Sequence, residues 1–332
     1  MTKLSAVPAR QLGASGPTVF PIALGCMSMS GIYGPADEQE SISTIHAALD
    51  AGVTLLDTGD FYGSGHNEML IGRALHDRRD KALVSVKFGA LRAPNGRWGG
   101  VDARPAALRN FLTYTLTRLG LDHVDIYRPA RLDPAVPIEE TVGAMADLVT
   151  GGYVRAIGLS EVGPDTIRRA HAVHPIVDLQ IEYSLISRAP EAQIFPVLEE
   201  LGIGVTAYGV LSRGLLSGSK PATAGDSRAL LPRFTGENRD RNDRLVGLLR
   251  QLAASRGLLP SQLAIAWVLA KGSRIVPVVG ARTRAQLAES LGALRVVLSP
   301  ADLATIEAAL PMSAVMGTRY DAHQMKMLDS ER

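Results

Sequence analysis

Residues 53–87, VTLLDTGDFYGSGHNEMLIGRALHDRRDKALVSVK, decide the fold of this chain. The run VTLLD (53–57) is apolar until it ends in Asp57, and LVSVK (83–87) is a second such run that ends in Lys87. A Gly-rich loop carries Tyr62 between them, and the pattern of residues 67–77 predicts a helix. A strand–helix–strand unit pairs its strands in parallel. We therefore expect Asp57 and Lys87 at neighbouring strand ends, with Tyr62 above them.

The parity of the second strand predicts where Lys87 points. Three apolar residues share one face of it: Val84, Val86 and Phe88. Ser85 and Lys87 share the other, which in a barrel faces inward. A buried lysine is costly unless it is paired, and Asp57 is the expected partner. A charged lysine beside Tyr62 would lower the pKa of the phenol and make it a proton donor near neutral pH. An ordinary strand-end salt bridge beside a loop tyrosine is the alternative.

Strand and helix signals alternate along the rest of the chain, which predicts a (β/α)8 TIM barrel. An N-terminal β-hairpin with its turn at 14–17 precedes the barrel, and residues 311–332 are expected to form a loop over the barrel mouth. No change of composition marks a boundary, so residues 1–332 are predicted to form a single domain. The predicted strands are 21–26, 53–57, 83–87, 123–130, 154–160, 177–183, 204–210 and 274–280. The predicted helices between and after them are 38–51, 67–77, 108–120, 139–152, 164–174, 190–202, 241–257, 260–272 and 283–294.

Composition narrows the class of protein. Hydrophobic residues make up 46% of the 332 residues, and the formal net charge is +2. The sequence shows neither a basic block for nucleic acid nor an apolar run for a membrane, so we expect neither partner. The single cysteine, Cys26, fits a reducing compartment, and a cytoplasmic location is expected. No metal site is predicted, since His171 and His174 on a predicted helix lack an evident third ligand.

Two strings carry a resemblance to a known family: DTGDFYGSGHNE (57–68) and AYGVLSRGLLSG (207–218). Together with Lys87 they resemble the aldo-keto reductases. The resemblance implies reduction of aldehydes or ketones to alcohols by hydride transfer from NADPH. It also implies that Tyr62 donates the proton, that Lys87 lowers the Tyr62 pKa, and that Asp57 pairs with Lys87.

The resemblance also implies a cofactor site at the strand ends. Ser160 and Gln180 would bind the nicotinamide carboxamide, and Tyr208 would stack on the nicotinamide ring. Arg282, after Gly280, would contact the 2′-phosphate of NADPH. The remaining implied cofactor residues are Gly25, Met27, Asp57, Gly209, Leu211, Ser212, Gly214, Gln286 and Glu289. Glu161 departs from the family's asparagine, which puts one carboxamide contact in doubt because a carboxylate has no amide donor.

A second departure lies at the end of the fourth predicted strand, in DIYRPARLDP (125–134). Ala130 stands where the family usually has a histidine that orients the substrate carbonyl. Arg128, of the same parity, and His66, on the Tyr62 loop, are the candidates to replace it. The expected pocket residues are Met29, Tyr33, Trp98 and the loop 211–239, whose apolar and aromatic side chains favour an aliphatic or aromatic aldehyde over a highly charged substrate.

Two other functions remain open at this stage. Some barrels of the family are nicotinamide-binding regulatory subunits with little turnover, which would make the chain a sensor. A metal-dependent barrel hydrolase is disfavoured, because no strand end offers a pair of histidines. The sequence leaves the oligomeric state and the physiological substrate undetermined.

Overall fold

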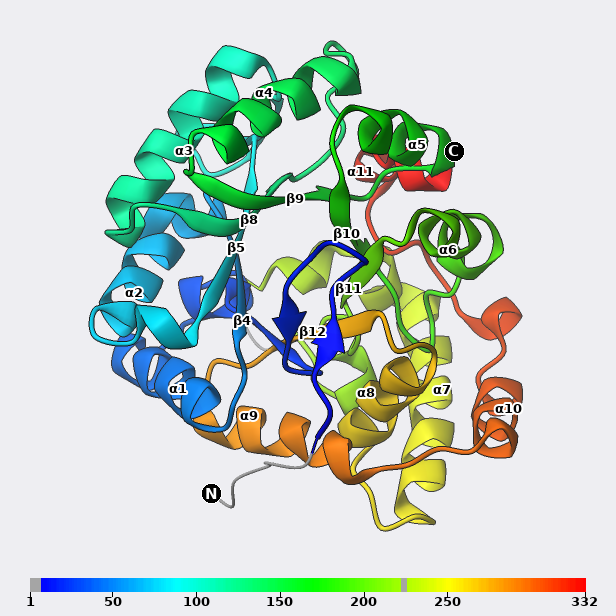
Figure 1. Ribbon diagram of the computed structural model, residues 1–332. Helices are drawn as coiled ribbons and strands as arrows, with labels where there is room; N and C mark the ends of the chain where they lie inside the picture. The colour runs from blue at the N-terminus through cyan, green and yellow to red at the C-terminus, as the bar shows by residue number, and fades with distance from the viewer. Residues whose placement is uncertain (1–6, 222–225) are drawn as a thin grey trace.

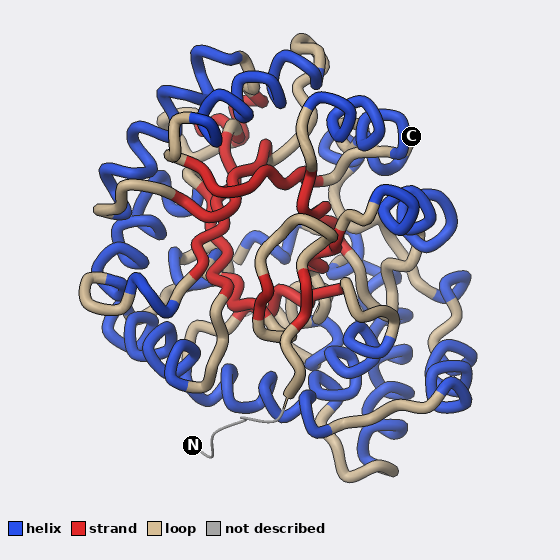
Figure 2. Tube along the Cα trace, viewed as in Figure 1, coloured by secondary structure: helices blue, strands red, loops and turns tan. Residues whose placement is uncertain are grey.

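The computed structural model of this protein describes residues 7–221 and 226–332. Within these residues, eight parallel strands close into a barrel in the cyclic order β3-β4-β5-β8-β9-β10-β11-β12. Figure 2 shows the strands as a ring enclosed by helices, as the alternating pattern predicts. The barrel strands are β3 (Ala23–Gly25), β4 (Leu55–Gly59), β5 (Leu83–Phe88), β8 (Val124–Pro129), β9 (Val154–Ser160), β10 (Ile176–Glu182), β11 (Gly204–Tyr208) and β12 (Ile275–Gly280).

The helices follow the strands around the outside of the barrel (Figure 1). Asp37 caps the first of them, because its side chain accepts a hydrogen bond from the Glu40 backbone N–H at 2.6 Å. The helices are α1 (Glu38–Asp50), α2 (His66–Leu75), α3 (Pro105–Leu119), α4 (Ile138–Thr150), α5 (Pro164–Val173), α6 (Pro190–Leu201), α7 (Gly236–Ala254), α8 (Pro260–Ala270), α9 (Arg284–Leu291), α10 (Pro300–Ala309) and α11 (Ala322–Met325).

Three features differ from the sequence-based expectation. Helix α7 starts at Gly236, five residues before the predicted start at 241. The long loop after β5 contains a hairpin of β6 (Ala90–Arg92) and β7 (Trp98–Val101). Residues 311–332 were expected to form a loop, but they contain the short helix α11. Helix α10, directly before them, was not predicted.

The N-terminal hairpin closes one end of the barrel. It pairs β1 (Arg10–Gln11) with β2 (Thr18–Val19), around the predicted turn. Leu12 and Val19 pack against side chains that fill the barrel interior, and Figure 1 shows the hairpin lying across the ring of strands. These interior side chains are Ala23, Leu55, Ile126, Val177, Val276 and Val278. The carboxyl ends of the strands remain at the opposite end, where the active sites of such barrels lie.

The parity prediction for β5 is confirmed. Val84, Val86 and Phe88 are fully buried in the cluster that joins the strands to the helices. Lys87 has the opposite parity and is buried near the carboxyl end of the barrel interior, with 5% of its surface exposed. Among the described helices, none combines the length and the apolar character needed to cross a bilayer.

Candidate active site

Asp57 and Lys87 form a buried ion pair at the ends of β4 and β5. The strand register aligns Asp57 with Ser85 and Gly59 with Lys87, so the two charged side chains are offset by two residues. Lys87 Nζ lies 2.6 Å from Asp57 Oδ2. Asp57 Oδ1 accepts a second hydrogen bond from Gln180 Nε2 at 2.8 Å. The carboxylate is therefore held by two neighbours and fixes the position of the ammonium group.

Tyr62 begins the 3-10 turn Tyr62–Gly65, directly after β4. Lys87 Nζ lies over its ring, 5.2 Å from the ring centre, which is a cation–π contact. Burial raises the pKa of Tyr62 well above its usual 10, and Asp57 raises it further; Arg131 is the cation that opposes this rise. The net pKa of Tyr62 is therefore raised, whereas the sequence predicted a lowered one. The contribution of Lys87 to this pKa stays a prediction. The phenol stays protonated near neutral pH, as a proton donor must be.

Ser160 and Gln180 lie side by side, because β9 and β10 align them in register. Both are buried, and Gln180 contacts Asp57. Gln180 uses its amide Nε2 to hold Asp57, which leaves its Oε1 as a hydrogen-bond acceptor. The Ser160 hydroxyl is a donor and an acceptor. A primary amide needs both kinds of partner, so the pair matches the groups that a nicotinamide carboxamide requires.

Glu161 is turned away from such a contact. Its backbone adopts a left-handed conformation, with φ of 54°. Its carboxylate accepts hydrogen bonds from Arg319 at 2.7 and 2.5 Å, from the Tyr208 hydroxyl at 2.7 Å and from Ser330 at 2.7 Å. Although burial alone would raise the pKa of Glu161, Arg319 holds it at about 2. The residue that departs from the family pattern therefore anchors the C-terminal segment.

The loop after β11 has the tight backbone that its sequence predicts. Gly209, Ser212 and Gly214 all have positive φ values, of 65°, 45° and 91°. At Gly209 a Cβ atom would lie 2.9 Å from the Glu182 side chain, so a larger residue would clash there. Leu211 accepts a backbone hydrogen bond from Gly214 at 2.9 Å. The Ser212 N–H likewise donates to the Gly209 carbonyl oxygen at 2.6 Å, so the loop is a series of tight turns held by its own backbone.

The other implied cofactor residues gather where β3 meets β12. Gly25 pairs with Gly280 on one side and with Asp57 on the other. Met27 follows at the start of a 3-10 turn. The next hydroxyl, that of Ser28, is buried without a hydrogen-bond partner among the described residues, and a Cβ atom at Gly280 would stand 3.8 Å from it. The glycine leaves space next to the Ser28 hydroxyl, and a polar ligand in this space could hydrogen-bond to that hydroxyl.

Arg282 lies two residues beyond β12, before α9. Its Nη1 donates to the backbone oxygens of Tyr33 and Pro35, each at 3.3 Å, and its own N–H donates to Gln286 Oε1 at 3.0 Å. Its guanidinium therefore contacts neutral carbonyl oxygens. The Glu289 carboxylate accepts a hydrogen bond from Ser261 of α8. Gln286 and Glu289 are thus both engaged within the protein.

Neither candidate replacement for the missing histidine points at the site. Arg128 is fully buried one layer down, where it donates to Asp178 at 2.8 Å, to Thr206 at 3.1 Å and to Ser85 at 2.9 Å. His66 Nδ1 lies 3.0 Å from the Ser30 hydroxyl, and His66 Nε2 lies 3.5 Å from Glu38. Both expectations are therefore wrong on geometric grounds, because each side chain is engaged elsewhere.

The barrel mouth is more basic than its expected lining suggested. Tyr33 lies under Arg228, 5.3 Å from its guanidinium, whereas Met29 is buried in the core. Trp98 lies in β7, and residues 222–225 of the expected pocket loop fall outside the described residues. Four arginines cluster around the two buried carboxylates Glu161 and Glu182: Arg131, Arg213, Arg233 and Arg319. This charge weakens the expectation of a purely apolar pocket.

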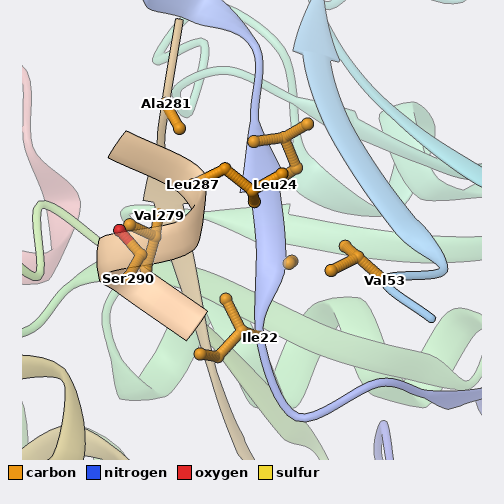
Figure 3. Close-up of a pocket in the computed structure, with 8 residues that line it drawn as sticks. Ile22, Leu24, Val53, Val279, Ala281, Leu287 and Ser290 are labelled. Atoms are coloured by element: carbon orange, nitrogen blue, oxygen red, sulfur yellow. The ribbon is translucent and has the colours of Figure 1, made fainter. Parts of the chain in front are cut away.

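A small cavity lies against α9 (Figure 3). Its volume is about 10 Å³, and it lies between β3, β12 and α9. Its lining is apolar except for Ser290, whose hydroxyl already donates to the Gln286 carbonyl oxygen at 2.9 Å. The cavity has space for about one water molecule. We interpret it as a packing gap between strands and helix.

The sequence analysis missed Arg131, Arg319 and Tyr320. The Arg131 guanidinium donates to the Tyr320 hydroxyl at 3.2 Å, and Tyr320 lies 3.0 Å from the Tyr208 hydroxyl. Arg131 was visible only as a flanking residue of Ala130. Tyr320 lies 189 residues after Arg131. The string GTRYDAHQ around Tyr320 has no periodicity that would predict a contact over this distance in sequence.

Comparison with known proteins agrees with this geometry. The Aldo/keto reductase family profile matches residues 21–311. A probable aldo-keto reductase from Glycine max is 41% identical over 96% of this chain and 93% of its own. The structure of a glycerol dehydrogenase from Gluconobacter oxydans superposes with a TM-score of 0.83 at 29% identity, over 92% of this chain and 95% of that one. An aldo-keto reductase from Bacillus halodurans, in a holo form, gives 0.77 at 28% identity, over 96% and 99%. This chain belongs to the aldo/keto reductase family of oxidoreductases.

Proposed function

We propose that this protein is an NADPH-dependent reductase that converts aldehydes or ketones to alcohols. The observation that carries the proposal is the buried Asp57–Lys87 pair directly beneath Tyr62, at the carboxyl ends of the barrel strands. A buried ion pair is costly to desolvate, so it contributes little to stability. Its position at the catalytic end of the barrel therefore favours a role in catalysis.

The proposed cofactor site follows the strand ends around the barrel. Ser160 and Gln180 would hold the nicotinamide carboxamide, and Tyr208 would lie against the ring. The backbone of residues 209–214 would bind the pyrophosphate, and Arg282 would exchange its carbonyl partners for the 2′-phosphate. When bound, the reduced nicotinamide supplies a hydride to the substrate carbonyl carbon. Gly25, Met27, Gln286 and Glu289 would complete the walls of the site.

Tyr62 is the proposed proton donor. Negative charge grows on the carbonyl oxygen as the hydride arrives, and the phenol hydrogen is the proton it takes up. Lys87 lies against the Tyr62 ring, so its positive charge stabilises the phenolate that the transfer leaves behind. Asp57 keeps Lys87 in this position. Tyr62 then regains its proton from solvent, which completes the cycle.

A nicotinamide-binding sensor with little turnover is the second candidate. It is favoured by Ala130, which removes one hydrogen-bond donor from the family's site, and by the high Tyr62 pKa. The deciding experiment mixes the protein with a panel of aldehydes and ketones and with NADPH or NADH, and follows cofactor oxidation. A reductase oxidises NADPH in the presence of at least one carbonyl. Tight NADPH binding without oxidation by any carbonyl would favour the sensor. We also propose a cytoplasmic location, in keeping with the single buried thiol of Cys26.

A further inference from the structure

The C-terminal segment, residues 317–331, docks into the barrel mouth through a buried ion pair. The Arg319 side chain is only 7% exposed and the Glu161 side chain is completely buried. Asp329 adds a second anchor, because its side chain accepts a hydrogen bond from the Gly163 N–H at 2.8 Å. In Figure 1 the C-terminus lies beside α5, which follows β9. The segment is therefore fixed at the strand end that precedes α5.

This docking links Tyr320 to the end of β8 through Arg131. Arg131 joins Ala130 and Tyr320, since its Nη1 donates to the Ala130 carbonyl oxygen at 2.6 Å and its Nη2 donates to the Tyr320 hydroxyl at 3.2 Å. On its other side the Tyr320 hydroxyl lies 3.0 Å from the hydroxyl of Tyr208. The phenol is thus connected through Arg131 to the residue that replaces the histidine, and it lies beside the tyrosine that we place against the nicotinamide.

The charges around Tyr320 make its hydroxyl a strong donor. The Arg213 guanidinium lies 4.5 Å from the centre of the ring, and that of Arg131 lies 5.6 Å from it. Although burial opposes ionisation, these two arginines lower the pKa of Tyr320 below its usual 10, whereas burial and Asp57 raise that of Tyr62. The charged and titratable groups that face Tyr320 are Arg131, Arg213, Arg319, Glu161, Glu182, Tyr208, Tyr62 and Tyr33.

Arg131 has a further property that a substrate site needs. Within the described residues, no carboxylate lies within ion-pair distance of its guanidinium, which contacts a carbonyl oxygen and a phenol instead. Because both of these partners are neutral, the guanidinium of the partly buried Arg131 would be stabilised by a negative charge that develops beside it. Such a charge develops on a carbonyl oxygen during reduction.

We propose that Tyr320, held by Arg131, donates a hydrogen bond to the substrate carbonyl oxygen and thereby replaces the histidine that Ala130 lacks. This inference rests on the proposed function and adds a second donor to it. Tyr62 still transfers the proton, and Tyr320 only orients the carbonyl and stabilises its developing charge. The residue that completes the site thus comes from the C-terminal segment, not from the end of β8.

The test compares steady-state kinetics of wild type, Tyr320→Phe, Tyr62→Phe and Tyr153→Phe on one aldehyde. Tyr320→Phe keeps the ring over Arg213 and removes only the hydroxyl, so kcat should fall by about 10²–10³. Tyr153 is exposed on the surface and serves as the matched control, with kcat unchanged. Binding of NADPH, measured by its fluorescence, should stay within about threefold of wild type for Tyr320→Phe, because a lost neutral contact near the ring is a small loss.

Two additional measurements separate a donor role from a structural one. Ultraviolet titration should show one phenol that ionises below the usual range in the wild type and in Tyr153→Phe, and this transition should be missing in Tyr320→Phe. Adding Ala130→His to Tyr320→Phe should restore kcat by at least about tenfold, since a histidine donor would return to its usual position.

Three results would overturn the inference. Wild-type kcat in Tyr320→Phe beside an inactive Tyr62→Phe would refute the second donor and leave the proposed function standing. Markedly tighter NADPH binding by Tyr320→Phe with undiminished turnover would show that the segment only obstructs the cofactor. A wild-type protein that binds NADPH and reduces no carbonyl would refute the proposed function, and the inference with it.

Discussion

At the scale of single residues, the site is built from charges that are neutralised in layers. Arg128 pairs with Asp178 in the barrel interior, and Lys87 pairs with Asp57 above them. The strand register aligns Lys87 with Arg128, and the proximity of these two cations contributes to the lowered pKa of Lys87, after burial itself. Each buried cation is therefore stabilised by the carboxylate with which it pairs. In this arrangement Arg128 has a structural role: it holds the barrel interior beneath the site in place.

The role of Arg128 leads to a prediction about stability. Arg128→Ala leaves Asp178 buried without its cation, which should cost roughly 3–5 kcal/mol of the free energy of unfolding. Denaturant unfolding of the purified variant measures this loss. His66→Ala, at the partly exposed histidine of the Tyr62 loop, is the control and should keep both stability and turnover. A stable Arg128→Ala variant that has lost only its turnover would return Arg128 to the list of substrate donors.

At the scale of elements, each strand end contributes one part of the site and each following loop contributes another. β4 supplies Asp57, β5 supplies Lys87, and the loop after β11 supplies the tight turns. The loop after β12 is where cofactor preference should be decided. Among the residues that the structure describes, the Arg282 guanidinium bonds neutral carbonyl oxygens, so a phosphate would be a better partner than those it has.

Arg282→Ala should weaken NADPH binding and leave NADH binding nearly unchanged. A charge-assisted contact to phosphate contributes roughly 1.5–3 kcal/mol, which is about one to two decades in affinity. Fluorescence titration with each cofactor gives both dissociation constants. Arg284→Ala is the neighbouring control, because Arg284 is exposed and already paired with Glu40 at 2.8 Å. An equal loss for the two cofactors would refute a contact between Arg282 and the 2′-phosphate.

The sequence predicted the barrel well because the strand signals are local. Val84, Val86 and Phe88 alternate with Lys87 in sequence as they do in space, so the position of Lys87 followed from parity alone. Glu161 and Arg319 show the limit of such reasoning. They are 158 residues apart, and their pairing depends on a chain reversal that no periodic pattern encodes. The high pKa of Tyr62 was missed for a related reason, since it depends on burial by several distant segments.

At the scale of the whole molecule, the buried carboxyl group of Asp60 makes the stability of the fold depend on pH. Asp60 follows β4, and its side chain accepts a long hydrogen bond from the Gly89 N–H, at 3.4 Å. Burial, and the nearby Glu68, raise the pKa of Asp60 from 3.8 to about 7. Because the folded pKa is the higher one, the native state binds the extra proton between about pH 4 and 7. Stability therefore falls as the pH rises through this window and levels off above it.

Asp60→Asn should remove this dependence. The variant should gain stability relative to wild type at pH 8 and lose most of that advantage near pH 4, because asparagine does not ionise. Each kcal/mol gained at pH 8 would raise the melting temperature by roughly 2–4 °C. Thermal unfolding at both pH values measures the difference. Asp77→Asn, at an exposed carboxylate, is the control; a parallel shift of both variants at every pH would contradict the assigned ionisation of Asp60.

The central claim is that the Tyr62 phenol delivers the proton in a carbonyl reduction. Its most direct test is the rate of NADPH oxidation by wild type and by Tyr62→Phe with one aldehyde that the wild type reduces, together with the NADPH dissociation constant of each. Loss of a general acid typically costs about 10²–10⁴ in rate, while the cofactor contacts remain. We predict that Tyr62→Phe binds NADPH almost as wild type does and reduces the aldehyde at least about a hundredfold more slowly. Near-normal turnover by Tyr62→Phe would contradict the account.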